Sequence, residues 1–142
     1  MSRVVVTGGG GLLGGHVVAA LAGEAEVTVL DVRPPDADVP FVEGSILDQA
    51  ALARAFRGAS RVVHLAAAAN IGAGSAETIY ELNARGTFQV LEAARAAGVE
   101  RVVLCSSDSV MGNTVWPEHF FLPDRLPVDE DHPVRPADPY GL

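Results

Sequence analysis

Short apolar runs alternate along the chain with longer segments whose apolar residues recur every three or four positions. The runs predict strands at residues 3–7, 27–30, 41–43, 61–66 and 101–106, and the periodic segments predict helices at residues 12–21, 50–56 and 78–97. Strands alternating with helices indicate βαβ units and a parallel sheet, and near-continuous apolar strands indicate that both faces of the sheet are covered. With right-handed crossovers, the expected fold is an α/β, doubly wound, Rossmann-type sheet.

The periodic segments also predict which side chains face the core. In residues 12–21, a stripe at four-residue steps consists of Leu13, Val17 and Leu21. In residues 78–97, the inward-facing residues are expected to be Ile79, Leu82, Val90, Leu91 and Ala94. Asp48 has the position and residue type of a helix N-cap.

The composition changes after Gly112. Most of the prolines and many acidic residues lie in the rest of the chain, so residues 112–139 are interpreted as a Pro-rich loop within one domain that spans residues 1–142. Long loops in compact domains are usually functional or disordered.

Charge and cysteine content narrow the function classes. The formal net charge is −8, which argues against nucleic acid or an anionic membrane as the main partner. The ten basic residues are all arginine. A single cysteine, no metal-ligand spacing, no secretory signal and no apolar run of about 20 residues together predict a cytoplasmic protein without a metal site. A dinucleotide remains compatible with the acidic charge, since backbone N–H groups can hold its phosphates.

A glycine-rich turn joins the first predicted strand to the first helix. Gly8, Gly11 and Gly14 have G-x-x-G-x-x-G spacing. In such turns one glycine permits the tight bend, one lets the backbone approach a pyrophosphate, and one allows the helix to pack closely on the strand. The pyrophosphate is then held at the helix N-terminus, where unpaired N–H groups favour an anion.

An acidic residue ends the second predicted strand at the distance that a dinucleotide site requires. Asp31 follows the glycine turn by about 20 residues, where a carboxylate binds the ribose hydroxyls. This carboxylate would repel a 2′-phosphate, which favours NAD over NADP, and the nearby Arg33 tempers that choice.

The ordered set of motifs resembles the extended short-chain dehydrogenases/reductases, also called the NAD-dependent epimerase/dehydratase family, over essentially the whole chain. The matching positions are Thr7–Gly14, Asp31, Gly44–Asp48, His64–Ala67, Asn83 with Gly86 and Thr87, Ser106 and Ser107, and Pro139–Gly141. The resemblance implies an NAD-binding domain over residues 1–142 that is partial, with an incomplete sheet at its C-terminal end and without a substrate domain.

The resemblance also assigns roles to individual residues. Those implied to bind NAD are Gly8, Gly11, Leu12, Leu13 and Gly14 at the pyrophosphate, Asp31 with Arg33 at the ribose, Ser45 and Ile46 beside the adenine, and Leu65, Ala66, Ala67, Asn83 and Tyr140 along the rest of the cofactor. The catalytic pair is Ser107, which would hydrogen-bond the substrate, and Tyr140, the acid/base. Three positions depart from the family pattern: Ser45 stands for an aspartate, Gln89 for an asparagine and Met111 for a tyrosine.

The family's catalytic motif is Tyr-x-x-x-Lys, and the sequence reads Tyr140-Gly141-Leu142. The lysine position would follow the last of the 142 residues, and no lysine occurs elsewhere. A free tyrosine has a pKa of about 10 and needs a nearby positive charge to act as a base at neutral pH. The expectation is therefore an N-terminal fragment that binds NAD and does not turn over substrate.

Among the reactions of the family, dehydration is disfavoured. Family dehydratases carry an Asp-Glu pair after the position of Ser107, whereas this chain has Asp108 and Ser109. A sugar or nucleotide-sugar epimerase, or a sugar dehydrogenase, remains, and the resemblance implies a homodimer for the complete protein. The alternatives are a redox-silent NAD(P)-binding regulatory module, which Ser107 and Tyr140 argue against, and a purely structural α/β module. His64, on an apolar strand, is expected to be structural.

Overall fold

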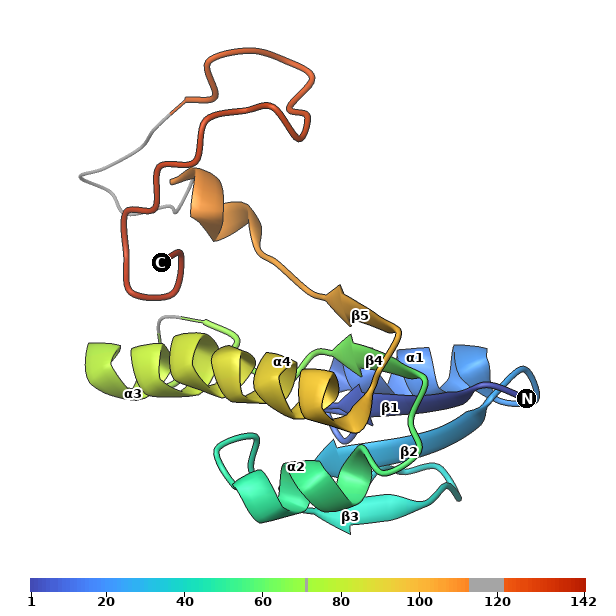
Figure 1. Ribbon diagram of the computed structural model, residues 1–142. Helices are drawn as coiled ribbons and strands as arrows, with labels where there is room; N and C mark the ends of the chain where they lie inside the picture. The colour runs from blue at the N-terminus through green and yellow to red at the C-terminus, as the bar shows by residue number, and fades with distance from the viewer. Residues whose placement is uncertain (71, 113–121) are drawn as a thin grey trace. The chain divides into compact units, whose positions relative to one another are not determined.

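The computed structural model describes residues 1–70, 72–112 and 122–142. Within these residues, five strands form one parallel sheet in the order β3-β2-β1-β4-β5, which confirms the doubly wound prediction (Figure 1). The strands are β1 (Arg3–Thr7), β2 (Glu26–Asp31), β3 (Phe41–Glu43), β4 (Arg61–His64) and β5 (Arg101–Leu104). The strand order reverses between β1 and β4, the switch point at which open α/β sheets bind ligands.

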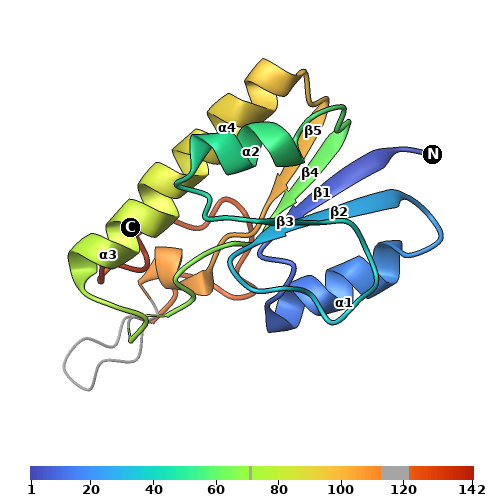
Figure 2. The same ribbon diagram turned by 90° about the horizontal axis from the view of Figure 1, so that it is seen from below.

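The chain divides into two compact units. The first comprises Met1–Ala67 and Arg85–Cys105, and the second comprises Ala68–Ala84 and Ser106–Leu142. The first unit holds the whole sheet with α1 (Leu12–Leu21), α2 (Gln49–Ala55) and α4 (Gly86–Ala97). The second holds α3 (Ala76–Tyr80), most of the π-helical turn Glu81–Arg85 and the 3₁₀ helix Asp108–Met111. In the first unit α1 covers one face of the sheet, and α2 and α4 cover the other (Figure 2).

Alternate residues along each strand build the two halves of the core. On the α1 side, a cluster of buried valines consists of Val4, Val6, Val18, Val27 and Val29. Val5, Leu30 and Val62 point to the opposite face, because successive strand side chains alternate. The fully buried residues of the covering helices and their ends include Leu52, Phe56 and Val90. The prediction that both faces of the sheet are covered is therefore confirmed for β1 and β2.

Two of the predicted inward-facing leucines point outward instead. Leu13 is 53% exposed and Leu91 is 43% exposed. In α1 the buried residues are Gly14 and Val18, so a glycine marks the buried face of the first turn and Leu13 lies about 100° away from it. The inward positions of Ile79, Val90 and Ala94 are confirmed.

The element boundaries agree with the sequence except where the chain turns toward the site. Asp48 caps α2 as predicted, and its Oδ1 accepts from the N–H groups of Ala50 at 2.8 Å and Ala51 at 3.2 Å. Strands β4 and β5 end two residues earlier than predicted. The predicted helix 78–97 begins instead at Ala76, behind the N-cap Ser75, and is interrupted by the π-helical turn. Of the predicted Pro-rich loop 112–139, residues 113–121 lie outside the described residues.

His64 lies in the core as a hydrogen-bonded bridge, which confirms the structural interpretation. It is 4% exposed, its Nδ1 is 2.6 Å from Thr7 Oγ1, and its Nε2 is 3.0 Å from Thr87 Oγ1. The imidazole therefore joins β1, β4 and α4. Burial lowers the pKa of His64 from 6.5 to about 4, so the folded protein holds it neutral.

This burial predicts a loss of stability in mild acid. The unfolded chain binds a proton at His64 near pH 6.5 and the folded chain only near pH 4. The stabilisation is therefore complete above pH 6.5 and is lost as the pH falls toward 4. Between about pH 7.5 and about pH 5, we expect His64 to lower the free energy of unfolding by about 2 kcal/mol.

Urea denaturation at the two pH values measures this difference. His64→Gln should reduce the pH dependence by about the same amount, whereas His16→Gln, a change at an exposed histidine, should leave it unchanged. A pH dependence that persists in His64→Gln would place the titrating group elsewhere.

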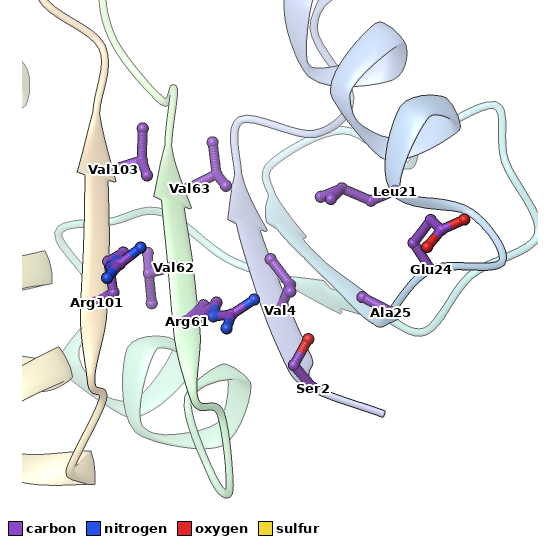
Figure 3. A pocket seen from close by; sticks show the side chains of 10 residues that line it. All are labelled: Ser2, Val4, Leu21, Glu24, Ala25, Arg61, Val62, Val63, Arg101 and Val103. Carbon is purple, nitrogen blue, oxygen red and sulfur yellow. The ribbon is translucent and has the colours of Figure 1, made fainter.

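The first unit also has a pocket at the amino-terminal ends of its strands. It has a volume of about 290 Å³ and is lined by the starts of β1, β4 and β5 and the end of α1, with Val4, Leu21 and Val63 among its residues (Figure 3). None of the residues predicted to bind NAD lines this pocket. Among the described residues, no helix is long and apolar enough to cross a membrane.

Candidate functional site

The glycine turn lies at the carboxyl end of β1, beside the switch point of the sheet. Gly8 has a φ of +77°, and a Cβ there would lie 2.6 Å from the amide nitrogen of Ala66. A Cβ on Gly14 would lie 2.1 Å from the carbonyl oxygen of Gly8. The turn is therefore packed main chain against main chain, between the segment that follows β4 and the first turn of α1.

The start of α1 presents N–H groups that suit an anion. Gly8 and Gly11 use their own N–H groups inside the fold, donating to Leu30 O at 2.9 Å and to Gly8 O at 3.1 Å. Gly11 is the N-cap and has no side chain that could accept from the first turn. The N–H groups of Leu12 and Leu13 therefore have no partner within the helix, and a bound pyrophosphate would fit them.

Asp31 is held in place by two main-chain donors. Its Oδ2 accepts from Gly10 N–H at 2.9 Å and its Oδ1 accepts from Arg33 N–H at 3.1 Å. The carboxylate predicted to bind the ribose is thus tied directly to the glycine turn. Gly10 was not among the predicted site residues, because it lies outside the G-x-x-G-x-x-G positions. The unbroken run of four glycines was the available signal.

The residues predicted to contact the adenine have mainly structural contacts. Ile46 is buried, and a Cβ on Gly86 would lie 2.5 Å from its Cδ1. Ser45 Oγ accepts from Leu47 N–H at 3.1 Å. With its amide nitrogen turned toward them, Gln89 donates to the carbonyls of Ile46 and Leu47 at 3.1 Å. The departure at Gln89 therefore has a structural role, which is to hold this segment.

The segment after β4 lies against the glycine turn. Leu65 N–H donates to Thr7 O at 3.0 Å, and Ala66 N–H makes a longer bond of 3.4 Å to Thr7 Oγ1. Leu65 packs partly against the valine cluster, and Ala67 is exposed. The structure therefore brings Ala66 to the glycine turn, as a residue lining the cofactor would require.

In the second unit, Asn83 fixes the backbone of Ala68. Its Oδ1 accepts from Ala68 N–H at 2.8 Å, and its Nδ2 donates to Ala68 O at 3.1 Å. Both polar groups of the carboxamide are therefore used by one residue of the main chain. A place for Asn83 beside the cofactor stays a prediction.

The two predicted catalytic residues lie on segments that contact each other within the second unit. Ser107 Oγ caps the 3₁₀ helix by accepting from Ser109 N–H at 3.2 Å. Asp138 Oδ1 accepts from the N–H groups of Tyr140 at 2.8 Å and Gly141 at 2.9 Å, which fixes the backbone of Tyr140. A Cβ on Gly141 would lie 2.6 Å from Ser109 O. The structure thus packs the Tyr140 segment onto the 3₁₀ helix that Ser107 begins.

The comparison with known proteins agrees with this geometry. A sequence model described as the NAD dependent epimerase/dehydratase family matches residues 4–142. The chain belongs to this family.

Three relatives show the extent of the similarity. A UDP-glucose 4-epimerase of Mus musculus is 36% identical over 99% of this chain and 45% of its own length. An L-arabinose 1-dehydrogenase (NAD(P)(+)) of Haloferax volcanii is 36% identical over 100% of this chain and 57% of its own length. A solved short-chain dehydrogenase/reductase superfamily protein from Agrobacterium tumefaciens, with bound NAD, is 38% identical, with a TM-score of 0.86 over 98% of this chain and 40% of that one. The chain thus spans about half the length of these relatives.

The contact between Gly14 and Gly8 predicts a sharp difference between two neighbouring glycines. Gly14→Ala should lower the free energy of unfolding by about 3 kcal/mol, since its Cβ would overlap a carbonyl oxygen that cannot move freely. Gly15→Ala should raise it by roughly 0.5–1 kcal/mol, because a Cβ at this exposed helical position meets open space. Thermal and urea unfolding of the two variants measure both effects. Equal shifts in the two variants would contradict the packing described here.

Proposed function

We propose that this chain is the NAD-binding portion of an NAD-dependent sugar or nucleotide-sugar epimerase or dehydrogenase of the extended short-chain type. The observation that carries the proposal is the bond between Gly10 N–H and Asp31 Oδ2. It combines a phosphate-binding turn and a ribose-binding carboxylate in one rigid element.

Each part of this element fits a portion of NAD. The N–H groups of Leu12 and Leu13, at the start of α1, would hold the pyrophosphate. Asp31 would accept hydrogen bonds from the adenosine ribose, since each of its oxygens keeps a second lone pair. Leu65 and Ala66, beside the glycine turn, would line the cofactor farther along.

When bound, NAD supplies the acceptor for a hydride from a substrate carbon. The chain's own contribution is to hold the reacting oxygen and to move its proton. Ser107 Oγ would hydrogen-bond that oxygen, and the phenolic oxygen of Tyr140 would take its proton and return it. Asp138 supports this role by fixing the main chain of Tyr140.

The substrate class follows from the relatives and from one residue. Two relatives are named for a UDP-glucose epimerase and an L-arabinose dehydrogenase. Ser109, which follows Asp108 in the 3₁₀ helix, has no carboxylate that could assist the loss of water, so dehydration is not proposed. We also propose a cytoplasmic location, consistent with the single cysteine, and a homodimer for the complete protein.

Titration with NADH tests the proposal directly. The purified 142-residue chain should enhance and shift NADH fluorescence in a saturable manner. It should show no steady-state turnover with NAD and either UDP-glucose or L-arabinose, because none of its residues is a lysine that could stabilise a tyrosine phenolate. Failure to bind NADH would favour a purely structural module. Turnover by this chain would disprove the stated dependence on a lysine.

Replacement of the ribose carboxylate tests the cofactor preference. Asp31→Arg should weaken NADH binding about tenfold, since it removes hydrogen bonds to a charged acceptor, and it should shift the preference toward NADPH. Asp38→Arg makes the same change in charge at an exposed position and serves as the control. Comparison of the dissociation constants for NADH and NADPH gives the result. An unchanged ratio in Asp31→Arg would refute the ribose assignment.

A further inference from the structure

Gly10 has no space for a side chain, although its position is outside the spaced glycines of the motif. A Cβ there would lie 2.4 Å from the carbonyl oxygen of Arg33 and 3.2 Å from that of Pro34. Both neighbours are main-chain atoms, which cannot rotate away as the end of a side chain can. The glycine turn is therefore in direct main-chain contact with the segment that follows β2.

The same contact fixes the orientation of a carboxylate. Gly10 N–H donates to Asp31 Oδ2 at 2.9 Å, and Arg33 N–H donates to Asp31 Oδ1 at 3.1 Å. Each oxygen of Asp31 thus has one defined donor, and the side chain is held in one rotamer. Without the bond from Gly10, only the donor two residues away in the same segment would restrain it.

We infer that Gly10 is a specificity-determining positioning residue, which sets the choice between NAD and NADP by holding Asp31 in place. The inference rests on the proposed function, since it concerns the ribose end of the same cofactor site. Gly10 acts through Asp31 and makes no contact with the ribose that the inference requires.

Two opposite charges next to the ribose position make the orientation decisive. The carboxylate of Asp31 favours a free 2′-hydroxyl, and the exposed guanidinium of Arg33 favours a 2′-phosphate. A carboxylate that is held in advance binds the hydroxyls without losing rotamer entropy, whereas a mobile one pays that entropy on binding. Once Asp31 is released, its advantage over Arg33 falls, and discrimination against NADP falls with it.

The chain offers a matched control for the substitution that tests this. Gly10→Ala and Gly15→Ala add the same methyl group within six residues of each other. Gly15 has no atom within 4 Å of a built Cβ, whereas Gly10 has a carbonyl oxygen at 2.4 Å. Any effect confined to Gly10→Ala therefore comes from the contact with the Arg33 segment.

Fluorescence titrations with NADH and with NADPH, together with melting temperatures, provide the readout. Gly10→Ala should weaken NADH binding about tenfold, as expected when one hydrogen bond to a charged group is lost. NADPH binding should change much less, so the preference for NADH falls. Gly15→Ala should retain both affinities. A merely structural defect at Gly10 would weaken both cofactors by the same factor, and that result would overturn the inference.

Two further variants keep the test decisive if Gly10→Ala does not fold. Asp31→Glu retains the charge and leaves the glycine turn intact, but its longer side chain cannot meet both N–H donors in the same geometry. If positioning matters, it should lose the preference for NADH, and a wild-type preference would overturn the inference. If Gly10→Ala folds, adding it to Asp31→Asn should cause no further loss of selectivity, because both changes act through one carboxylate.

The outcomes also separate this inference from the proposed function. If the wild-type chain binds neither NADH nor NADPH, the proposed function fails. If it binds NADH and Gly10→Ala keeps the wild-type ratio of the two affinities, only the inference fails. Equal wild-type affinity for the two cofactors would also overturn the inference.

Discussion

The first unit depends on the close main-chain contact between Gly8 and Ala66. These residues follow two adjacent parallel strands, in which Thr7 is in register with His64. Because Gly8 has no Cβ and a positive φ, the chain can turn sharply out of β1 beside the segment that leaves β4. Gly14 then packs on Gly8 O and fixes the start of α1, and the bond between Thr7 and His64 stabilises the same junction from inside the core.

The sequence predicted the elements best where local signals are strong. The bounds of β1, β3 and α1 agree with the prediction, because glycines or prolines delimit these segments. The cap at Asp48 follows from the short side chain of aspartate and the helical spacing that comes after it. The strand order could be inferred because right-handed crossovers leave few ways to connect alternating strands and helices.

What the sequence could not provide depends on contacts between distant segments. Leu13 has the spacing of a core residue, yet the buried face of the first turn of α1 is set by the contact between Gly14 and Gly8. Asn83 has both polar groups of its side chain bonded to Ala68, which lies 15 residues away in the chain. Gly10 could not be recognised as a site residue until Arg33 O was found where its Cβ would be. Spacing along the chain reports which face a residue occupies and not what that face meets.

The same contacts explain how an acidic chain can suit an anionic ligand. With a net charge of −8 and no lysine, the protein offers a pyrophosphate little long-range attraction. The positive end of α1 and the N–H groups of its first turn supply that attraction locally, without any cationic side chain. Asp31 does not offset it, because two main-chain N–H donors bind and partly neutralise its carboxylate. The charges that matter for the ligand are therefore those of the backbone, and their positions depend on glycines that allow the main chain to come this close.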